Sequence, residues 1–426
     1  MVTRRKRRSA AVPEQPSGSL AIQMPPEKAE PASMGNVLMM VVPMLGSTGV
    51  MIFMAIQNSG GNNNNRSLLM GGGMLVAMLG MVGFNMYRQF SQYRTRVVTQ
   101  RREYLSYLAE TRDAVRKVAK KQRAYYNWVY PDPNALVTLA ANGSRLWSRE
   151  GGTYDLFAFR YGSGTQPLGL IFERPPIDPM TEMDVVCLSA MERFINVHDH
   201  TDNVGKFLFL GDFSHIEVAG EGEAVYDEMR AIMMHLACFI DPSKLKIAVL
   251  CSADRLGDWE WVKWMPQARS SIVRDAVGPG RMISTDPREL AEMIGPDIAM
   301  RGAYRPGDDM PEWPHLLLVL DGAEFPPNSP FGSAVGVRGV TIMSRVREWT
   351  AMKSHTALRL VIHPNPDHKG ADVVDVVTMD SLPEQAFADR LTAVQAEAVA
   401  RRMTPFATQQ NLEEAETPVG RSDESR

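Results

Sequence analysis

Cysteine is scarce in this chain of 426 residues, and the scarcity limits the kinds of site that it can build. Cys187, Cys238 and Cys251 stand far apart, each in apolar surroundings. An odd number of cysteines without short spacing argues against a disulfide framework and against a zinc site. We therefore expect three buried, reduced thiols and no metal centre.

Net charge is also nearly absent, because 46 Lys and Arg residues face 49 Asp and Glu residues, which leaves −3. A balance this small does not indicate a nucleic-acid partner, and we expect none. The basic residues are nevertheless concentrated before Arg123. A composition of 44% hydrophobic and 22% charged residues is typical of a globular chain rather than a disordered one.

Charged residues are missing from two runs of 20 residues near the N-terminus, residues 37–56 and 68–87. Each run is about as long as a helix needs to cross a hydrocarbon core of ~30 Å. Two buried core helices are the alternative, which the length and the absence of charge disfavour. The sequence therefore predicts a transmembrane hairpin at residues 36–87, after a basic cytoplasmic tail at residues 1–35.

Arginines flank this predicted hairpin on one side. Residues 4–8 read RRKRR, five arginines follow the second run, and the connecting loop carries only Arg66. The positive-inside rule then places both termini in the cytoplasm of a two-span plasma-membrane protein. Glycines in both runs favour packing against other membrane subunits, and the flanking arginines suit anionic membrane lipid.

Glycine and proline are absent from residues 85–130, a composition that predicts a helix ended by Pro131. We interpret residues 88–130 as a stalk helix. A weak heptad runs along it, interrupted by two polar residues, and consists of Tyr104, Leu108, Thr111, Val115, Val118, Gln122 and Tyr125. Its basic far end is either a surface for a partner or a solvated face, and the sequence leaves both open.

After Pro131, short apolar runs alternate with helical patterns. The expected strands are residues 206–211, 214–220, 244–251, 315–321, 339–343, 357–363 and 372–379, and the expected helices are residues 184–198, 223–239, 287–300 and 384–402. Residues 154–162 and 167–173 read as a two-stranded hairpin with the turn GSGTQ. The pattern predicts a cytoplasmic α/β domain at residues 131–403 with a mostly parallel sheet, followed by a disordered tail at residues 404–426.

A phosphate-binding loop of the form G-x-x-x-x-G-K-[ST] is missing from the chain, although one strand, HLLLVLD, ends in Asp321 as a Walker B strand does. After the strand SHIEVAG, where such a loop belongs, Gly220 and Gly222 remain without the lysine and the hydroxyl residue. Glu221 and Glu223 supply negative charge to the helix start and should repel a triphosphate. We interpret Gly220, Gly222 and Asp321 as a degenerate nucleotide site in a degenerate P-loop ATPase-like domain.

Catalysis by this domain alone is not expected. ATPases of this class generally place a second acid directly after the magnesium-binding aspartate, and here Gly322 follows Asp321. Asp321 then reads as a strand-end residue that caps a turn or a helix. We expect no catalytic residues and no cofactor, with ATP and magnesium kept as the lesser alternative.

Two histidine pairs and a tryptophan cluster complete the candidates. His198 with His200, and His363 with His368, provide only two ligands each, so surface histidines are the preferred interpretation. Residues 258–266, DWEWVKWMP, hold three tryptophans that serve either an interface or packing against the sheet.

Several longer stretches resemble EccC, the motor subunit of actinobacterial type VII secretion. They are EYLSYLAETRDAV, AYYNWVYPDPNALVTLAANGSRLWSRE, MMHLACFIDPSKLKIAVLCSADRLGDWEWVKWMPQ, PHLLLVLDG and AEAVARRMTPF. The resemblance implies a membrane hairpin, a stalk and a degenerate ATPase-like domain, before three FtsK/SpoIIIE-type ATPase domains in one chain or split over two. This sequence stops where the first motor domain should begin. A separate polypeptide then carries the motors, or the chain is a fragment or a truncated paralogue.

Three hypotheses follow. In the first, this is a membrane-anchored subunit of a type VII secretion complex, whose pseudo-ATPase domain couples cytoplasmic ATPase motors to the membrane channel. Its expected partners are the other membrane core subunits and an ATPase-bearing EccC chain. In the second, the domain is an ATPase in its own right that uses Gly220, Gly222 and Asp321. In the third, the chain is a fragment of a DNA-translocase-like membrane protein.

Overall fold

The structure is a computed structural model. It describes residues 11–30, scattered residues between 39 and 57, and residues 64–416 apart from 150–155, 277, 308–313, 348–349, 353 and 368–369. The chain divides into two compact units. The larger unit comprises Met1–Gln15, Lys121–Pro167 and Thr201–Arg426, and the smaller one comprises Pro16–Lys120 and Leu168–His200.

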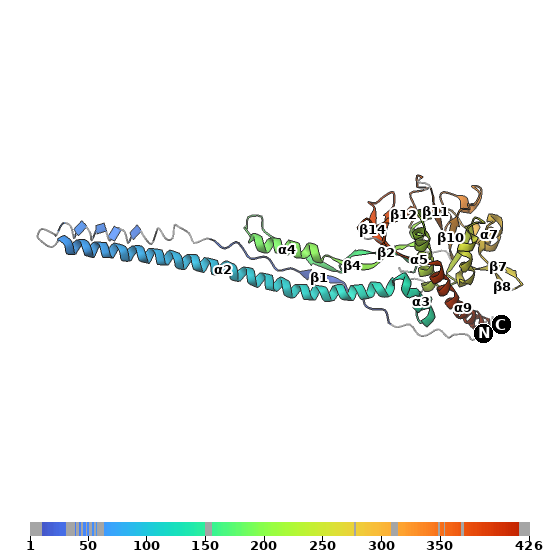
Figure 1. The fold of residues 1–426 in the computed structure, drawn as a ribbon, viewed down its shortest axis with the longest axis horizontal. Coiled ribbons are helices and arrows are strands. Elements are labelled where there is room, and N and C mark those ends of the chain that lie inside the picture. Colours follow the sequence, from blue (N-terminus) through green and yellow to red (C-terminus); the bar gives the residue numbers. More distant parts are fainter. Residues whose placement is uncertain are drawn as a thin grey trace, which may run out of the picture. The chain divides into compact units, whose positions relative to one another are not determined.

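The smaller unit is built on helix α2 (Asn64–Val129), which continues into the larger unit from Lys121 (Figure 1). The predicted helix over residues 85–130 is thus confirmed, because no glycine or proline interrupts it. Strands β1 (Gly18–Ala21) and β3 (Leu170–Glu173) pair in parallel, and α4 (Val185–His198) follows.

Tyr104, Leu108 and Val115, three members of the weak heptad on α2, are buried in the smaller unit. They share a core with Ile22 and with residues of α4 that include Phe194. These three heptad residues therefore pack against other parts of the same chain. Asp184 caps α4 by accepting hydrogen bonds from two backbone N–H groups, and Arg101 on α2 donates to the same carboxylate at 2.8 and 2.9 Å.

Across the described residues, no helix combines the length and the apolar character that a membrane span requires. The predicted two-span plasma-membrane topology with both termini in the cytoplasm is therefore wrong. The second predicted span, residues 68–87, forms part of α2. Glycines such as Gly80 and Gly83 add no apolar side chain to this segment, and the same helix is strongly charged from Arg88 onward. Most of the first predicted span, residues 37–56, lies outside the described residues.

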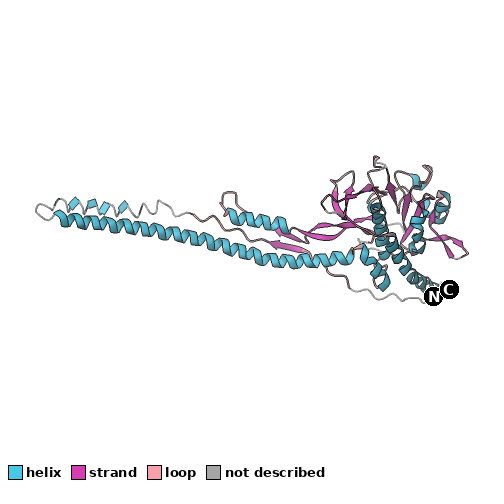
Figure 2. Ribbon diagram, viewed as in Figure 1, coloured by secondary structure: helices cyan, strands magenta, loops and turns pink. Residues whose placement is uncertain are grey.

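A sheet of ten strands forms the centre of the larger unit (Figure 2), in the order β4-β2-β14-β13-β12-β5-β11-β10-β6-β9. Its members are β2 (Ala158–Pro167), β4 (His200–Phe209), β5 (His215–Gly220), β6 (Leu245–Cys251), β9 (Ile283–Ser284), β10 (His315–Asp321), β11 (Val340–Val346), β12 (Ala357–Pro364), β13 (Asp372–Val377) and β14 (Glu384–Ala388). The six strands from β12 to β9 in this order are parallel, while β12–β13, β13–β14 and β14–β2 pair antiparallel. A mixed, mostly parallel sheet in an α/β unit is thus confirmed.

Helices and short turns complete this unit. They are α3 (Pro133–Asn142), α5 (Ala224–Phe239), α6 (Leu256–Trp259), α7 (Pro287–Ile294), α8 (Pro296–Ala299), α9 (Ala393–Glu416) and the 3-10 turns η1 (Leu210–Asp212), η2 (Glu260–Trp264), η3 (Pro266–Ala268) and η4 (Pro330–Gly332). A separate antiparallel hairpin consists of β7 (Arg269–Asp275) and β8 (Gly278–Arg281).

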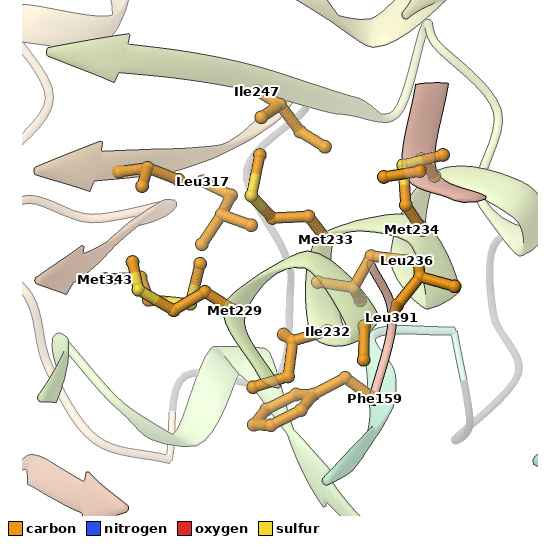
Figure 3. Packing of buried hydrophobic residues seen from close by; sticks show 14 of the residues in the cluster. Phe159, Met229, Ile232, Met233, Met234, Leu236, Ile247, Leu317, Met343 and Leu391 are labelled. Atoms are coloured by element: carbon orange, nitrogen blue, oxygen red, sulfur yellow. The ribbon is translucent and has the colours of Figure 1, made fainter. Parts of the chain in front are cut away.

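Side chains from alternate positions of the central strands enter two different cores. Ile247 and Leu317 join the core that also contains α5 residues such as Met233 (Figure 3). Their sequence neighbours Ala248 and Leu318 join the other core, which contains residues of α7 and α8. Because both faces of the strands are buried, the strands read as continuous apolar runs in the sequence.

Three local predictions are corrected by this fold. The predicted hairpin of residues 154–162 and 167–173 does not form, because the run GSGTQ lies inside β2. Gly162 pairs with Ala388 of β14, and a Cβ at Gly162 would lie 2.4 Å from the carbonyl oxygen of Phe387. The predicted helix at residues 384–402 begins as strand β14, which pairs with β13 and β2. Helix α9 continues to Glu416 instead of becoming disordered at residue 404, since Met403 and Phe406 pack in the core.

Candidate functional site

The turn between β5 and α5 holds the two glycines that the sequence singled out. Gly220 ends β5 with φ +142°, and a Cβ there would lie 2.5 Å from the carbonyl oxygen of Ile362 on β12. Gly222 has φ +70° and open space around it. Backbone conformation favours glycine at both positions, and close packing also requires it at the first. Both residues therefore have a structural reason to be glycine without any nucleotide.

The carboxylates around this turn are directed to an arginine of the same helix. Glu223 is the N-cap residue of α5, yet its side chain accepts no capping hydrogen bond. It pairs instead with Arg230, which also donates to Asp227 at 3.0 Å and, through Nε, to the carbonyl oxygen of Leu391 at 3.0 Å. The expectation that Glu223 satisfies the helix end is wrong in this respect. Burial raises the pKa of Asp227, while Arg230 opposes that rise.

Asp321, at the end of β10, is completely buried, and protein donors surround its carboxylate. The indole Nε1 of Trp259 donates to it at 2.9 Å and Nε of Arg255 donates at 3.3 Å. The hydroxyl of Tyr226 donates a weaker bond at 3.4 Å. Asp321 was predicted to cap a turn or a helix. Its side chain instead accepts hydrogen bonds from Tyr226 of α5, Trp259 of α6 and Arg255. The cation beside this carboxylate is therefore a guanidinium group.

Gly322 occupies the place where a catalytic second acid was sought. Its φ is +75°, and a Cβ there would lie 2.5 Å from Oγ of Ser252. The backbone conformation alone disfavours every residue with a side chain. Ser252 is held nearby because its N–H donates to the carbonyl oxygen of Asp321 at 2.9 Å. An acid at position 322 would therefore need a left-handed backbone and a shift of the Ser252 hydroxyl group.

Tyr226, near the start of α5, contacts Asp321 and two arginines. Its ring lies 4.4 Å from the guanidinium carbon of Arg255 and 4.7 Å from that of Arg345, and its hydroxyl accepts a hydrogen bond from Arg345 at 2.5 Å. Burial and the charge of Asp321 raise the pKa of Tyr226, whereas the arginines lower it. Strand β11 separates β5 from β10, so the predicted residues lie on strands that are near each other without being adjacent.

These residues do not fit a magnesium nucleotide. Magnesium needs oxygen ligands with free lone pairs in octahedral geometry, whereas the carboxylate of Asp321 already accepts hydrogen bonds from Trp259, Arg255 and Tyr226. The turn offers the acids Glu221 and Glu223 in place of a lysine and a hydroxyl group. No step of ATP hydrolysis can be derived from this arrangement.

The histidine pairs do not assemble a metal site in the part of the chain that the structure covers. No group of three or more His, Cys, Asp or Glu residues suited to a metal ion occurs among the described residues. His200 pairs with Asp199 at 2.5 Å and His363 with Asp375 at 3.1 Å, while the ring of His198 lies 4.9 Å from that of Phe194. His368 lies outside the described residues. The three cysteines are buried and free, as predicted.

Sequence reasoning missed Tyr226, Arg255 and Trp259 as the partners of Asp321. Trp259 belongs to the tryptophan cluster, for which packing and an interface were both considered; its ring is buried, as is that of Trp261. These residues lie far from Asp321 in the sequence: Tyr226 is 95 residues away and Arg255 is 66 residues away. No local signal could have joined them.

Comparison with known proteins gives a consistent family. No family model matches the chain. It is 31% identical over 416 residues to "ESX secretion system protein EccC" of Thermomonospora curvata, which covers 96% of this chain and 30% of that relative. It is 29% identical over 327 residues to "ESX-1 secretion system protein EccCa1" of Mycobacterium tuberculosis, covering 72% of this chain and 40% of that relative. The chain thus spans well under half the length of these relatives.

Among solved structures, the chain is similar to the "Cytoplasmic domain of the Thermomonospora curvata Type VII Secretion ATPase EccC". The TM-score is 0.31 and the identity 14%, over 44% of this chain and 25% of that one. The sequence relationship covers nearly the whole chain and agrees with the resemblance that the sequence motifs suggested. This chain is a homologue of the EccC proteins of type VII secretion systems.

Proposed function

We propose that this chain is a non-catalytic coupling subunit of a type VII secretion system. In this proposal its α/β unit is a pseudo-ATPase that transmits movements of ATPase-bearing EccC chains to other subunits of the secretion complex. The role in secretion is supported by the homology to EccC proteins. The non-catalytic part rests chiefly on one observation, the buried carboxylate of Asp321 with its three protein donors.

Opening this site to magnesium has a calculable cost. A hydrogen bond to a charged group contributes about 1.5–3 kcal/mol, and a buried donor left without a partner costs a similar amount. Removing Asp321 from Trp259 and Arg255 breaks two such bonds, of which the indole bond is wholly buried. The loss of these two bonds therefore opposes opening of the site, and a closed site suits a part that transmits force.

The competing function is ATP hydrolysis by this chain itself, with Gly220, Gly222 and Asp321 as the nucleotide site. Isothermal titration calorimetry of the full chain with ATP, in the presence and absence of magnesium, separates the two functions. We expect no binding at millimolar ATP. Micromolar affinity that depends on magnesium and disappears in Asp321→Ala would establish the competing function.

The coupling part has its own test. A purified ATPase-bearing EccC chain should bind this chain in a co-purification experiment. Binding should not require that this chain itself holds a nucleotide. Arg255→Gln should weaken the closed site without removing the fold, because Arg255 is partly exposed. If neither the natural chain nor the variant binds an ATPase-bearing EccC chain, the coupling proposal fails even where the calorimetry supports a closed site.

A further inference from the structure

Two arginines face each other across the β7–β8 hairpin. Arg269 lies directly opposite Arg281 in the antiparallel register. Residues opposite each other in such a pair have Cβ atoms about 4.5–5.5 Å apart on one face, and like charges there destabilise the pairing. Neither arginine forms an ion pair with any residue of the described part of the chain. Within the described part of the chain, these two positive charges thus have no carboxylate partner.

The same two side chains carry buried donors that are not used. Nε of Arg269 and Nη1 of Arg281 are buried and have no hydrogen-bond partner among the described residues. Burial lowers the pKa of Arg269, and the charge of Arg281 lowers it further. Charged donors in proteins are nearly always satisfied by a protein group, water or a bound ion. The hairpin therefore carries charged donors that no group among the described residues satisfies.

A third cation lies beside Arg269, on strand β6 of the central sheet. Lys246, the second residue of β6, donates from Nζ to the backbone carbonyl oxygen of Arg269 at 3.1 Å. Burial lowers the pKa of Lys246, Arg269 lowers it further, and Asp241 is the acid that opposes the shift. Asp241 also accepts hydrogen bonds from the backbone and hydroxyl of Ser243 at 2.8 and 2.7 Å. Lys246 thus lies near the carboxylate of Asp241, which already accepts hydrogen bonds, while Arg269 and Arg281 form no ion pair among the described residues.

This basic cluster lies at the opposite end of β6 from the candidate nucleotide site. Lys246 is five residues from Cys251, which pairs with Asp321 in the parallel register. At ~3.3 Å per residue the two ends are ~17 Å apart. The cluster is thus a separate feature that the closed site at Asp321 does not explain.

We propose that Arg269, Arg281 and Lys246 form a binding site for an oxyanion of the phosphate class. Guanidinium groups recognise phosphate oxygens through paired N–H donors, and an ammonium group adds a point charge. A phosphate dianion balances the charge of these three cations better than a single carboxylate does. Free inorganic phosphate and the phosphate group of a nucleotide have this chemistry in common.

The test is a titration of the full chain with inorganic phosphate, by calorimetry and by thermal unfolding, at constant ionic strength with chloride as the reference anion. Arg281→Gln removes one of the facing charges. Arg274→Gln is the matched control, since Arg274 lies on the same hairpin, is exposed and carries the same charge. We expect saturable phosphate binding that weakens about tenfold or more in Arg281→Gln and stays unchanged in Arg274→Gln.

Thermal stability without phosphate and binding of adenosine diphosphate provide two further tests. Without phosphate, Arg281→Gln should unfold at the same or a higher temperature than the natural chain, because the variant removes repulsion from Arg269. Adenosine diphosphate in place of phosphate identifies the source: tighter binding than phosphate points to a nucleotide, equal or weaker binding to the free ion. Binding no stronger than that of chloride, or an equal loss in Arg274→Gln, would overturn the proposal.

Discussion

Replacing Gly322 with alanine tests how firmly the chain excludes a second acid beside Asp321. The left-handed backbone at Gly322, φ +75°, costs a residue with a Cβ about 1–2 kcal/mol. The Cβ would also lie 2.5 Å from Oγ of Ser252, and relief of such crowding typically costs about 1–3 kcal/mol. We therefore expect Gly322→Ala to lower the free energy of unfolding by about 2–5 kcal/mol.

Gly222→Ala is the matched control, because Gly222 has nearly the same φ, +70°, and no atom within 4 Å of its Cβ position. It should lose only the backbone part, about 1–2 kcal/mol. Urea unfolding followed by tryptophan fluorescence measures both variants. Adding Ser252→Gly should restore part of the loss in Gly322→Ala and none in Gly222→Ala. Equal losses in the two alanine variants would refute the crowding argument.

Two other predictions concern buried polar groups. Asp321→Ala should lower the free energy of unfolding by about 3 kcal/mol, because it leaves Trp259 and Arg255 without their acceptor. Asp321→Asn should lower it by less. Small and equal losses for the two variants in urea unfolding would show that these hydrogen bonds contribute little to stability. Burial lowers the pKa of His315 to about 3, so below pH ~6.5 the unfolded chain binds the extra proton and stability falls as the pH falls. His315→Gln should remove about 1.4 kcal/mol per pH unit of this decline between pH 4 and 6; an unchanged slope would contradict the buried neutral histidine.

Much of the α/β unit could be predicted from the sequence. Strands such as β10 are buried on both faces, so they read as unbroken apolar runs, and α2 is a long segment without glycine or proline over residues 85–130. The antiparallel extension could not be predicted. Gly162 and Gly164 in β2 have the composition of a turn, but Gly162 is small to allow the close approach of β14. That approach depends on residues more than 200 positions away.

The candidate site shows the same division. The missing lysine, the acids at the β5–α5 turn and the glycine after Asp321 were visible in the sequence and led to the hypothesis of a degenerate site. The donors that close it were not visible, because Tyr226, Arg255 and Trp259 reach Asp321 only through tertiary packing. The prediction of two membrane spans relied on the length of two uncharged runs and on the arginines that flank them, and it was wrong, since these features do not account for glycine content or for the charged continuation of α2.

The indole N–H resonance of Trp259 gives the most direct measurement of whether the site at Asp321 is closed. This resonance can be assigned in a nitrogen–proton correlation spectrum, because it is absent from the spectrum of Trp259→Phe. The exchange of the indole proton with solvent can be followed in the same spectrum. Our account predicts a slowly exchanging proton whose resonance does not move when magnesium and ATP are added to millimolar concentration. A saturable shift of this resonance, accompanied by faster exchange, would show that Asp321 leaves Trp259 for the metal and would contradict the account.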